Sequence, residues 1–287
     1  MGTTTIGSVA TRRRFRVRPG QALTALALAV VVAALFLAVF GEVIAPDDPR
    51  RVDLNAGSLG PVSGHLLGTD QLGRDILSRA LAGARTAIFG PLIIAASTVV
   101  ISTVLGLVAG YVGGWTDATL SRVNDIVYAL PPLLVAIVVV GVLGGGFGLG
   151  IVILVVLNIP ASFRSQRAAS LEQRGLPYIE AARVLGLSRW RIMRIHVLPN
   201  IMPVVSSSFF IAFTYAFVDL STLSFLGLGV APGTPDWGRM VAESRILVFE
   251  NPWAALAPLL LIVATAVSAN LVGEAVDDRI AAKGRGR

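Results

Sequence analysis

The sequence contains no cysteine, only two histidines and a single lysine among its 24 basic residues. Without cysteine there is no disulfide framework and no thiolate metal site. His65 and His196 do not belong to an HExxH-type ligand motif, and no segment matches GxxxxGK[ST], whose backbone amides and lysine hold nucleotide phosphates. The chain is therefore not predicted to hydrolyse ATP, and any process driven by ATP requires another polypeptide.

Charge is also scarce, because 14% of the residues are charged and 54% are hydrophobic, whereas about 25% are charged in an ordinary globular domain. Several apolar runs reach the roughly 20 residues that a helix needs to cross a bilayer. The first run follows an arginine-rich stretch, but its length and its lack of a small-x-small site favour a retained span over a cleaved signal. The sequence predicts an all-α integral membrane protein with six transmembrane helices, at 22–41, 88–112, 126–146, 148–167, 201–228 and 254–275.

The net charge of +7 has two readings, a nucleic-acid partner or the accumulation of Lys and Arg on the cytoplasmic side of membrane spans. Most of the basic residues fall in alternate connecting segments, which favours the second reading and predicts both termini in the cytoplasm. The predicted cytoplasmic segments are 1–21, 113–125, 168–200 and 276–287. No nucleic-acid partner is predicted.

Five short features lie in or beside the expected spans. The stretch "GTDQLGRDILSRALAGAR" predicts an amphipathic helix on the outer membrane surface, with Asp70–Arg74 and Asp75–Arg79 as i, i+4 pairs. It is either a docking surface or a packed lead-in helix.

Gly106, Gly110 and Gly114 predict close helix packing in span two. The segment 141–150 predicts a short outer turn. Arg122 with Asp125 is expected to form an i, i+3 pair, and Arg164 and Arg167 are expected to anchor at lipid headgroups.

The stretch "PYIEAARVLGLSRWRIMRIHVLPN" predicts two short helices separated by a forced bend on the cytoplasmic side. Pro177 suits a first helical turn, Gly186 suits a helix C-terminus, and Ser188 suits an N-cap. Pro199 is expected to end the second helix before span five begins. The second helix is expected to carry an apolar stripe of Trp190, Met193 and Val197. The pattern fits either a plain interfacial loop or a rigid element that a motor protein grips.

Asp219 lies inside a predicted span, where an ionisable group is costly and indicates a functional site. Ser208, Tyr215 and Thr222 fall on the same helical stripe. These four residues are candidates for a polar translocation path in which the carboxylate meets a cationic group of the substrate. The alternative is that Asp219 bonds to a neighbouring helix.

The 177–197 element also resembles a known signature. Six residues in this element and directly after it resemble the EAA motif of the permease subunits of bacterial ATP-binding-cassette importers. They are Glu180, Ala181, Ala182, Gly186, Leu198 and Pro199. In that family the element is a coupling helix that docks on the ATPase. His196 stands where the family usually has isoleucine.

Three further stretches resemble the dipeptide/oligopeptide importer branch, specifically its C-type subunit: "GTDQLGRDILSRALAGAR", "GYVGGWTDATLSRVNDIVYALP" and "LSTLSFLGLGVAPGTPDWGRM". The resemblance implies a type I importer permease fold in the bacterial inner membrane. It also implies as partners a homologous B-type permease, one or two cytoplasmic ATP-binding subunits and an extracytoplasmic substrate-binding protein. ATP and magnesium would be bound by the ATPase subunits, with no cofactor in this chain.

Three regions are expected. They are an N-terminal arm with the first span and outer amphipathic segment (1–85), a core permease domain (86–278) and a cytoplasmic tail (279–287). The predicted function is import of di- or oligopeptides coupled to ATP hydrolysis by partners. A nickel or other small-solute importer of the same branch, a secondary transporter and an intramembrane hydrolase are the alternatives. The sequence shows no convincing internal repeat, which a secondary transporter would be expected to have. It also shows no second catalytic group for an intramembrane hydrolase.

Overall fold

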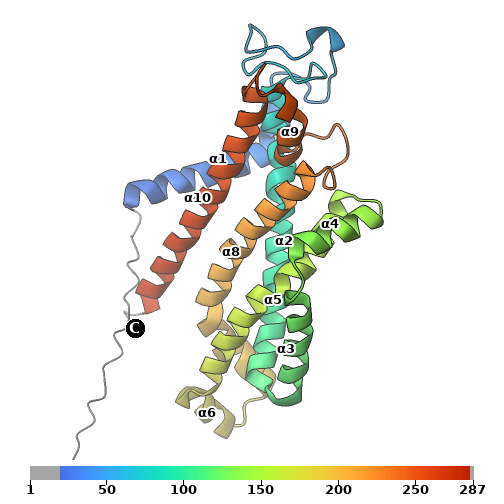
Figure 1. The fold of residues 1–287 in the computed structure, drawn as a ribbon. Coiled ribbons are helices and arrows are strands. Elements are labelled where there is room, and N and C mark those ends of the chain that lie inside the picture. The colour runs from blue at the N-terminus through green and yellow to red at the C-terminus, as the bar shows by residue number, and fades with distance from the viewer. Residues whose placement is uncertain (1–19, 285–287) are drawn as a thin grey trace, which may run out of the picture.

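The computed structural model describes residues 20–284, and over this range the chain is helical apart from turns, loops and two isolated bridges. The expected cytoplasmic arm before residue 20 and the last residues of the tail lie outside the described part. The helices are α1 (Gln21–Ile44), α2 (Ile76–Val112), α3 (Gly114–Tyr128), α4 (Pro132–Val142), α5 (Phe147–Arg174), α6 (Pro177–Val184), α7 (Arg189–Ile192), α8 (Leu198–Phe225), α9 (Trp237–Ser244) and α10 (Trp253–Gly284). Figure 1 shows α2, α5, α8 and α10 running side by side, whereas α1 crosses them at a steep angle near the irregular outer segment, and α6 lies at the opposite end.

Within the described range, five helices are long and apolar enough to cross a bilayer, and a sixth span is possible if α3 and α4 count together. The axes of α3 and α4 differ by 76°. The expected span at 126–146 is therefore not one uninterrupted helix, because it is broken between α3 and α4. The break falls at Pro131 and Pro132, whose missing N–H groups and ring sterics prevent the preceding turn from continuing. The other long helices agree with the expected spans.

The centre of the bundle is α2, which packs against α5, α1 and α8, while α10 packs against α8, α1 and α9. Gly106 and Gly110 make the α2–α5 contact close. A Cβ atom at Gly110 would lie 2.7 Å from the carbonyl oxygen of Arg167, and one at Gly106 would lie 3.0 Å from the Arg167 nitrogen. Close packing at these two glycines is confirmed. Gly114 instead begins α3 and has no such neighbour.

The turn between α4 and α5 confirms the expected outer link, because Gly144, Gly145 and Gly146 all have positive φ. The charges on the inner side pair differently from expectation. Arg164 donates to Asp125 at 2.8 Å, and Arg167 forms an ion pair with Asp117 on α3. These arginines therefore fasten α5 to α3, since each finds a carboxylate on a neighbouring helix.

The expected amphipathic helix on the outer surface is wrong as a separate element. Residues 68–75 form loop and turn, and the helical part of the motif is the first turns of α2. Asp75 is the N-cap of α2 and accepts hydrogen bonds from the backbone N–H and hydroxyl of Ser78, each at 2.7 Å, so it does not pair with Arg79. Asp70 and Arg74 do form an ion pair, at 2.7 Å, but within the loop.

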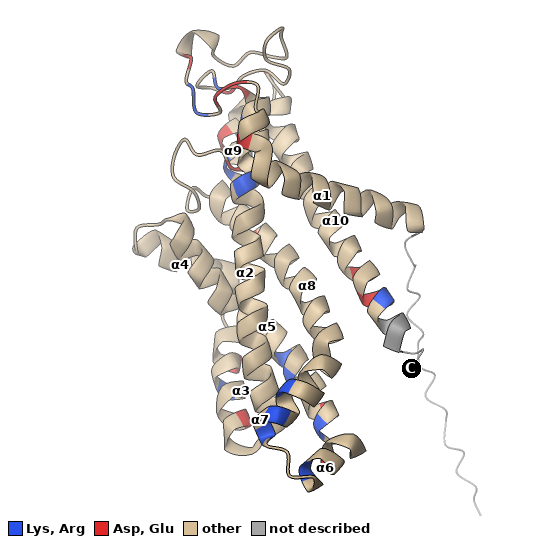
Figure 2. Ribbon diagram, turned by 180° about the vertical axis from the view of Figure 1, so that it is seen from behind, with Lys and Arg blue, Asp and Glu red and all other residues tan. Residues whose placement is uncertain are grey.

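Glu243 on α9 ties this loop to the rest of the outer end. It accepts from Arg74 at 2.8 Å, from Arg79 at 3.1 Å and from Arg239 at 2.8 Å, and the Arg79 side chain is only 1% exposed. Burial opposes ionisation of Glu243, but the hydrogen bond from Arg239 and the charges of Arg79 and Arg74 hold its pKa below the ordinary value. Figure 2 shows these acidic and basic positions together around α9. The network fixes the outer loop to α2 and α9.

Replacing Glu243 by glutamine is expected to destabilise the outer end, because two buried guanidinium groups lose one of their two carboxylate partners and share only Asp70. Removing one partner of a buried ion pair costs about 3–5 kcal/mol. Thermal unfolding of the purified protein should show this loss at neutral pH. Glu250→Gln, at an exposed position on the same side, is the matched control, and an equal effect of the two variants would contradict the assigned role. The stabilisation from Glu243 should be present above its unfolded pKa and should fall as pH drops through the lowered folded pKa.

Candidate functional site: the coupling element and the polar groove

The 177–197 segment folds as expected into two short helices with a bend. Pro177 occupies the first turn of α6, and Gly186 ends that helix with φ +77°. The N–H of Leu187 donates to the Ala182 carbonyl at 3.2 Å, and that of Gly186 to the Arg183 carbonyl at 3.0 Å, which is a Schellman motif. Ser188 then caps α7 by accepting from the N–H of Arg191. We call this segment the coupling element.

One face of the coupling element packs on the cytoplasmic end of α2. Its buried residues form one cluster with Ile201 of α8 and with Leu107 and Tyr111 of α2; they are Ile179, Ala182, Ile192, Met193 and Val197. Met193 and Val197 belong to this face as expected, whereas Trp190 is 63% exposed and points away from it. The element is therefore seated by apolar packing against α2 and is not an independent loop.

Pro199 does not separate the coupling element from span five, contrary to expectation. A π-helical turn (Met193–Val197) joins α7 to α8, and the whole stretch Arg189–Phe225 is one 37-residue helix. Pro199 lies in the first turn of α8. The wide π turn supplies the local adjustment that a proline ring requires, so the chain continues as a helix.

A side-chain contact also joins α6 to α8. The Asn200 amide donates to the Tyr178 hydroxyl at 3.1 Å and to the His196 carbonyl at 2.7 Å. The Tyr178 hydroxyl in turn bonds Gln173 at 2.5 Å, at the end of α5. Both halves of the coupling element are thus connected to the start of α8.

The face of the coupling element that points away from α2 is apolar and exposed. Val184 is 88% exposed, Leu185 is 79% exposed, and Trp190 lies beside the bend on the same segment. Glu180, Ala181 and Gly186 are exposed, whereas Ala182 is buried and Leu198 is half-buried. Sequence reasoning missed Val184 and Leu185, although two large apolar residues directly before a glycine C-cap were a usable signal.

The coupling element also carries exposed arginines, namely Arg183, Arg189, Arg191 and Arg194. Figure 2 shows blue positions gathered at the end of the molecule that carries α6 and α7. This charge places the coupling element on the cytoplasmic side. An exposed apolar patch near charged residues is typical of a protein docking surface.

A groove that combines apolar surface with several polar side chains lies between α5 and α8, further along the same continuous helix, and we call it the polar groove. It has a volume of about 120 Å³ and is lined by Asn158, Ala161, Ser162, Ser165, Ser208, Ile211, Ala212 and Tyr215. Of the four residues in the predicted stripe, Ser208 and Tyr215 line this groove, whereas Asp219 and Thr222 do not. Asp219 faces Asn158 of α5, and Thr222 bonds its own helix, at Val218. The α5 side of the groove was missed, because one helix stripe does not reveal its partner.

Replacing Gly186 by alanine is expected to loosen the bend. A left-handed conformation costs an L-residue about 1–2 kcal/mol, while the space around the missing Cβ is open, so the effect is conformational and not steric. Amide hydrogen exchange at residues 185–188 should quicken about 5- to 30-fold. Gly175→Ala, at φ −84° in the C-cap of α5, is the matched control and should leave exchange unchanged. Equal exchange in both variants would show that positive φ is not required.

The fold and the site together define a multi-pass membrane protein in which an exposed cytoplasmic element is continuous with a membrane helix. The chain belongs to the family of binding-protein-dependent transport system inner membrane components, whose model matches residues 102–282. It is therefore a permease subunit of an ATP-binding-cassette importer and an inner-membrane protein.

Several curated relatives match nearly the whole chain. The probable D,D-dipeptide transport permease DdpC of Escherichia coli K12 is 32% identical over 93% of this chain and 90% of its own length. The di/tripeptide permease DppC of Pseudomonas aeruginosa is 36% identical over 88% and 86%. The glutathione permease GsiD of Pectobacterium atrosepticum is 35% identical over 87% and 83%.

A solved structure of the MetNI methionine ABC transporter shares the fold. It has a TM-score of 0.58 at 19% identity and covers 69% of this chain and 94% of the matched chain. The expected type I importer permease fold is confirmed.

Proposed function

We propose that this chain imports di- or oligopeptides by alternating access, driven by ATP hydrolysis on partner subunits. One observation carries the proposal: the helix Arg189–Phe225 begins in the coupling element and carries Ser208, Tyr215 and Asp219 past the polar groove. A displacement at one end of a helix is transmitted to the other, because its backbone hydrogen bonds resist local bending.

The proposed partners follow from the surface of the coupling element. A cytoplasmic ATPase docks on the exposed residues Val184 and Leu185. The residues of the motif contribute to this contact or hold it in position; they are Glu180, Ala181, Ala182, Gly186, Leu198 and Pro199. One or two such subunits bind ATP and Mg²⁺, and this chain holds neither. A homologous B-type permease completes the pathway, and an extracytoplasmic substrate-binding protein delivers the cargo.

The length of the continuous helix Arg189–Phe225 determines the proposed mechanism. At 1.5 Å per residue, Asp219 lies about 45 Å along the helix from Arg189. ATP-driven closure of the ATPases pulls on α6 and α7, and the Tyr178–Asn200 hydrogen bond and the π turn pass that movement to α8. The α8 side of the groove then moves against α5, which opens the path to one side of the membrane at a time.

Peptide chemistry suits the groove. Serine hydroxyls, the Asn158 amide and the Tyr215 hydroxyl can exchange hydrogen bonds with successive peptide groups, whatever the side chains of the cargo. The Asp219 carboxylate can attract the cationic amino terminus. The named relatives that transport dipeptides, tripeptides and glutathione support this substrate class. A nickel or other small-solute importer is the second candidate, and a secondary transporter is disfavoured by family membership.

Uptake of labelled di-, tri- and longer peptides, with labelled nickel in parallel, tests the substrate class. Cells lacking this chain should lose peptide uptake and regain it when the chain is restored. Peptide uptake that is unchanged while nickel uptake is lost would assign the chain to metal import instead.

Leu185→Asp tests the coupling step in the same cells and in the purified complex. A charge on the exposed apolar face should lower substrate-stimulated ATP hydrolysis and uptake at least tenfold, since a lost docking contact of about 1.4 kcal/mol already changes an equilibrium tenfold. Leu185→Met keeps the apolar surface and should retain both activities. Normal hydrolysis and uptake in Leu185→Asp would contradict docking at this face.

A further inference from the structure

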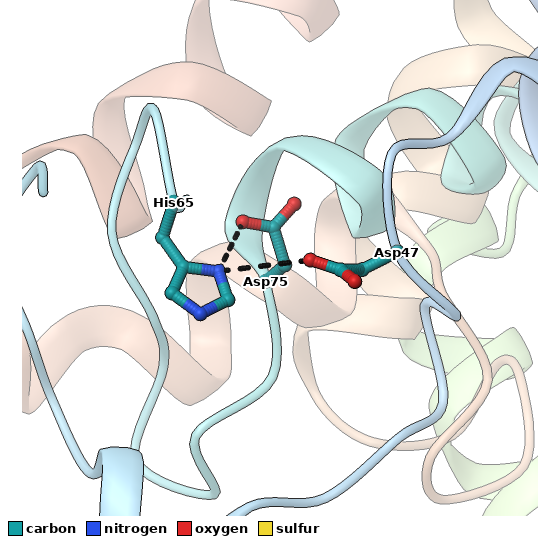
Figure 3. Close-up of side chains that lie close together, drawn as sticks. All are labelled: Asp47, His65 and Asp75. Carbon is teal, nitrogen blue, oxygen red and sulfur yellow. Dashed lines mark hydrogen bonds and ion pairs between the residues drawn. The ribbon is translucent and has the colours of Figure 1, made fainter. Parts of the chain in front are cut away.

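A cluster of ligand-type side chains lies at the outer end of the molecule, away from the coupling element and the groove. Figure 3 shows Asp47, His65 and Asp75 converging from three separate segments. Asp47 follows α1, His65 lies in a tight turn closed by a pair of hydrogen bonds with Val62, and Asp75 caps α2. One ligand atom from each lies within 4.8 Å of the other two. We propose that these three residues bind a divalent first-row transition-metal ion, of which Zn²⁺ is the representative.

The distances fit such an ion. His65 Nδ1 lies 3.0 Å from Asp75 Oδ1 and 3.9 Å from Asp47 Oδ2. Bonds of 2.0–2.2 Å in tetrahedral geometry place two ligand atoms about 3.4 Å apart, which falls between these two values. Small shifts of the Asp47 side chain, which is 41% exposed, bring all three atoms onto one ion, and water supplies the fourth ligand.

The ligands are held in place before any ion binds. Asp75 uses Oδ2 for Ser78, with two bonds of 2.7 Å, which turns Oδ1 toward His65. The same Ser78 hydroxyl accepts the backbone N–H of Asp47 at 3.0 Å. Ser78 therefore orients two of the three ligands, as the outer hydrogen-bond partners of metal ligands generally do.

The surrounding charge favours a cation independently of the ligand geometry. The adjoining cavity, of about 240 Å³, is open enough to admit a hydrated ion. Carboxylates outnumber guanidinium groups in its lining, which contains Asp47, Asp48, Arg51, Asp53, Gly64, His65, Gly73 and Asp75. An imidazole with two carboxylates suits a transition metal, whereas Ca²⁺ and Mg²⁺ prefer sets made of oxygen alone.

The ion would have a structural use. Residues 45–75 connect α1 to α2 through roughly 30 residues whose only helical part is the short turn Leu54–Ala56, and segments of this length without secondary structure are uncommon in compact domains. The chain has no cysteine with which to cross-link them. A metal held by three segments would close this loop on the first turn of α2.

The test uses the full chain in its assembled complex, purified without a histidine tag and treated with a chelator. Zn²⁺ and Co²⁺ are titrated, and bound metal is measured by mass spectrometry and by the visible absorption of Co²⁺. The wild-type complex should hold one equivalent more than the complexes with Asp47→Asn or His65→Gln, and these variants should bind it at least tenfold more weakly. Neither variant removes the cap of α2, so both should fold.

Asp48→Asn is the matched control, because Asp48 lines the same cavity without belonging to the three ligands. It should bind the metal as the wild type does. Equal weakening by Asp48→Asn would show diffuse electrostatic attraction, and equal metal content in wild type and Asp47→Asn would show no site here; either result overturns the proposal. Displacement of Co²⁺ by excess Mg²⁺ or Ca²⁺ would do the same. These measurements need neither ATP nor peptide and are independent of the proposed transport function.

Discussion

The continuity of one helix, Arg189–Phe225, is the constraint on which the rest of the structure depends. Its first turns belong to the coupling element and carry the exposed Trp190 beside Val184 and Leu185 at the end of α6, and its later turns form one wall of the polar groove. Sharp helix bends occur at features such as prolines and π turns, and here these lie near the cytoplasmic start of the helix, at Met193–Val197, Pro199 and Pro203. The rest of the helix is therefore expected to move as one body. The apolar seat on Leu107 and Tyr111 and the Tyr178–Asn200 hydrogen bond add α2 and α6 to the same moving body.

The outer end is stabilised by a different kind of interaction. There, buried charges join distant segments in addition to the apolar packing of Trp237, Met240 and Leu247, with Glu243 accepting from three arginines and Trp237 donating to the Ala80 carbonyl at 2.7 Å. Buried ion pairs contribute little net stability against apolar packing but penalise every arrangement that separates the partners. The outer loop is thereby held in a single position, while the cytoplasmic end presents its unpaired apolar residues to a partner.

Local signals predicted local structure well. The bend in the coupling element followed from Pro177, Gly186 and Ser188, since a proline, a positive-φ glycine and a capping serine act on their own few residues. Partners remote in sequence defeated the same reasoning. The spacing of Asp75 and Arg79 predicted a pair within one helix, but Arg79 donates a hydrogen bond to Glu243, more than 160 residues away. The sequence also predicted a helix break at Pro199. The π turn that accommodates this proline depends on packing against α2, which the local sequence does not reveal. For the groove, spacing identified the α8 residues, and only the tertiary fold supplied Asn158.

The most direct test of the central claim is a distance measurement along the continuous helix. Because the chain lacks cysteine, spin labels can be placed at cysteines introduced at the exposed positions Arg191 and Val218, which lie about 40 Å apart along a helix. In the assembled complex, pulsed electron paramagnetic resonance should give the same peak distance in nucleotide-free and ATP-bound states. Over the same change, the distance from Arg191 to a label at Val39 on α1 should shift. A changed or broadened Arg191–Val218 distance would reveal a hinge inside the helix and contradict the account.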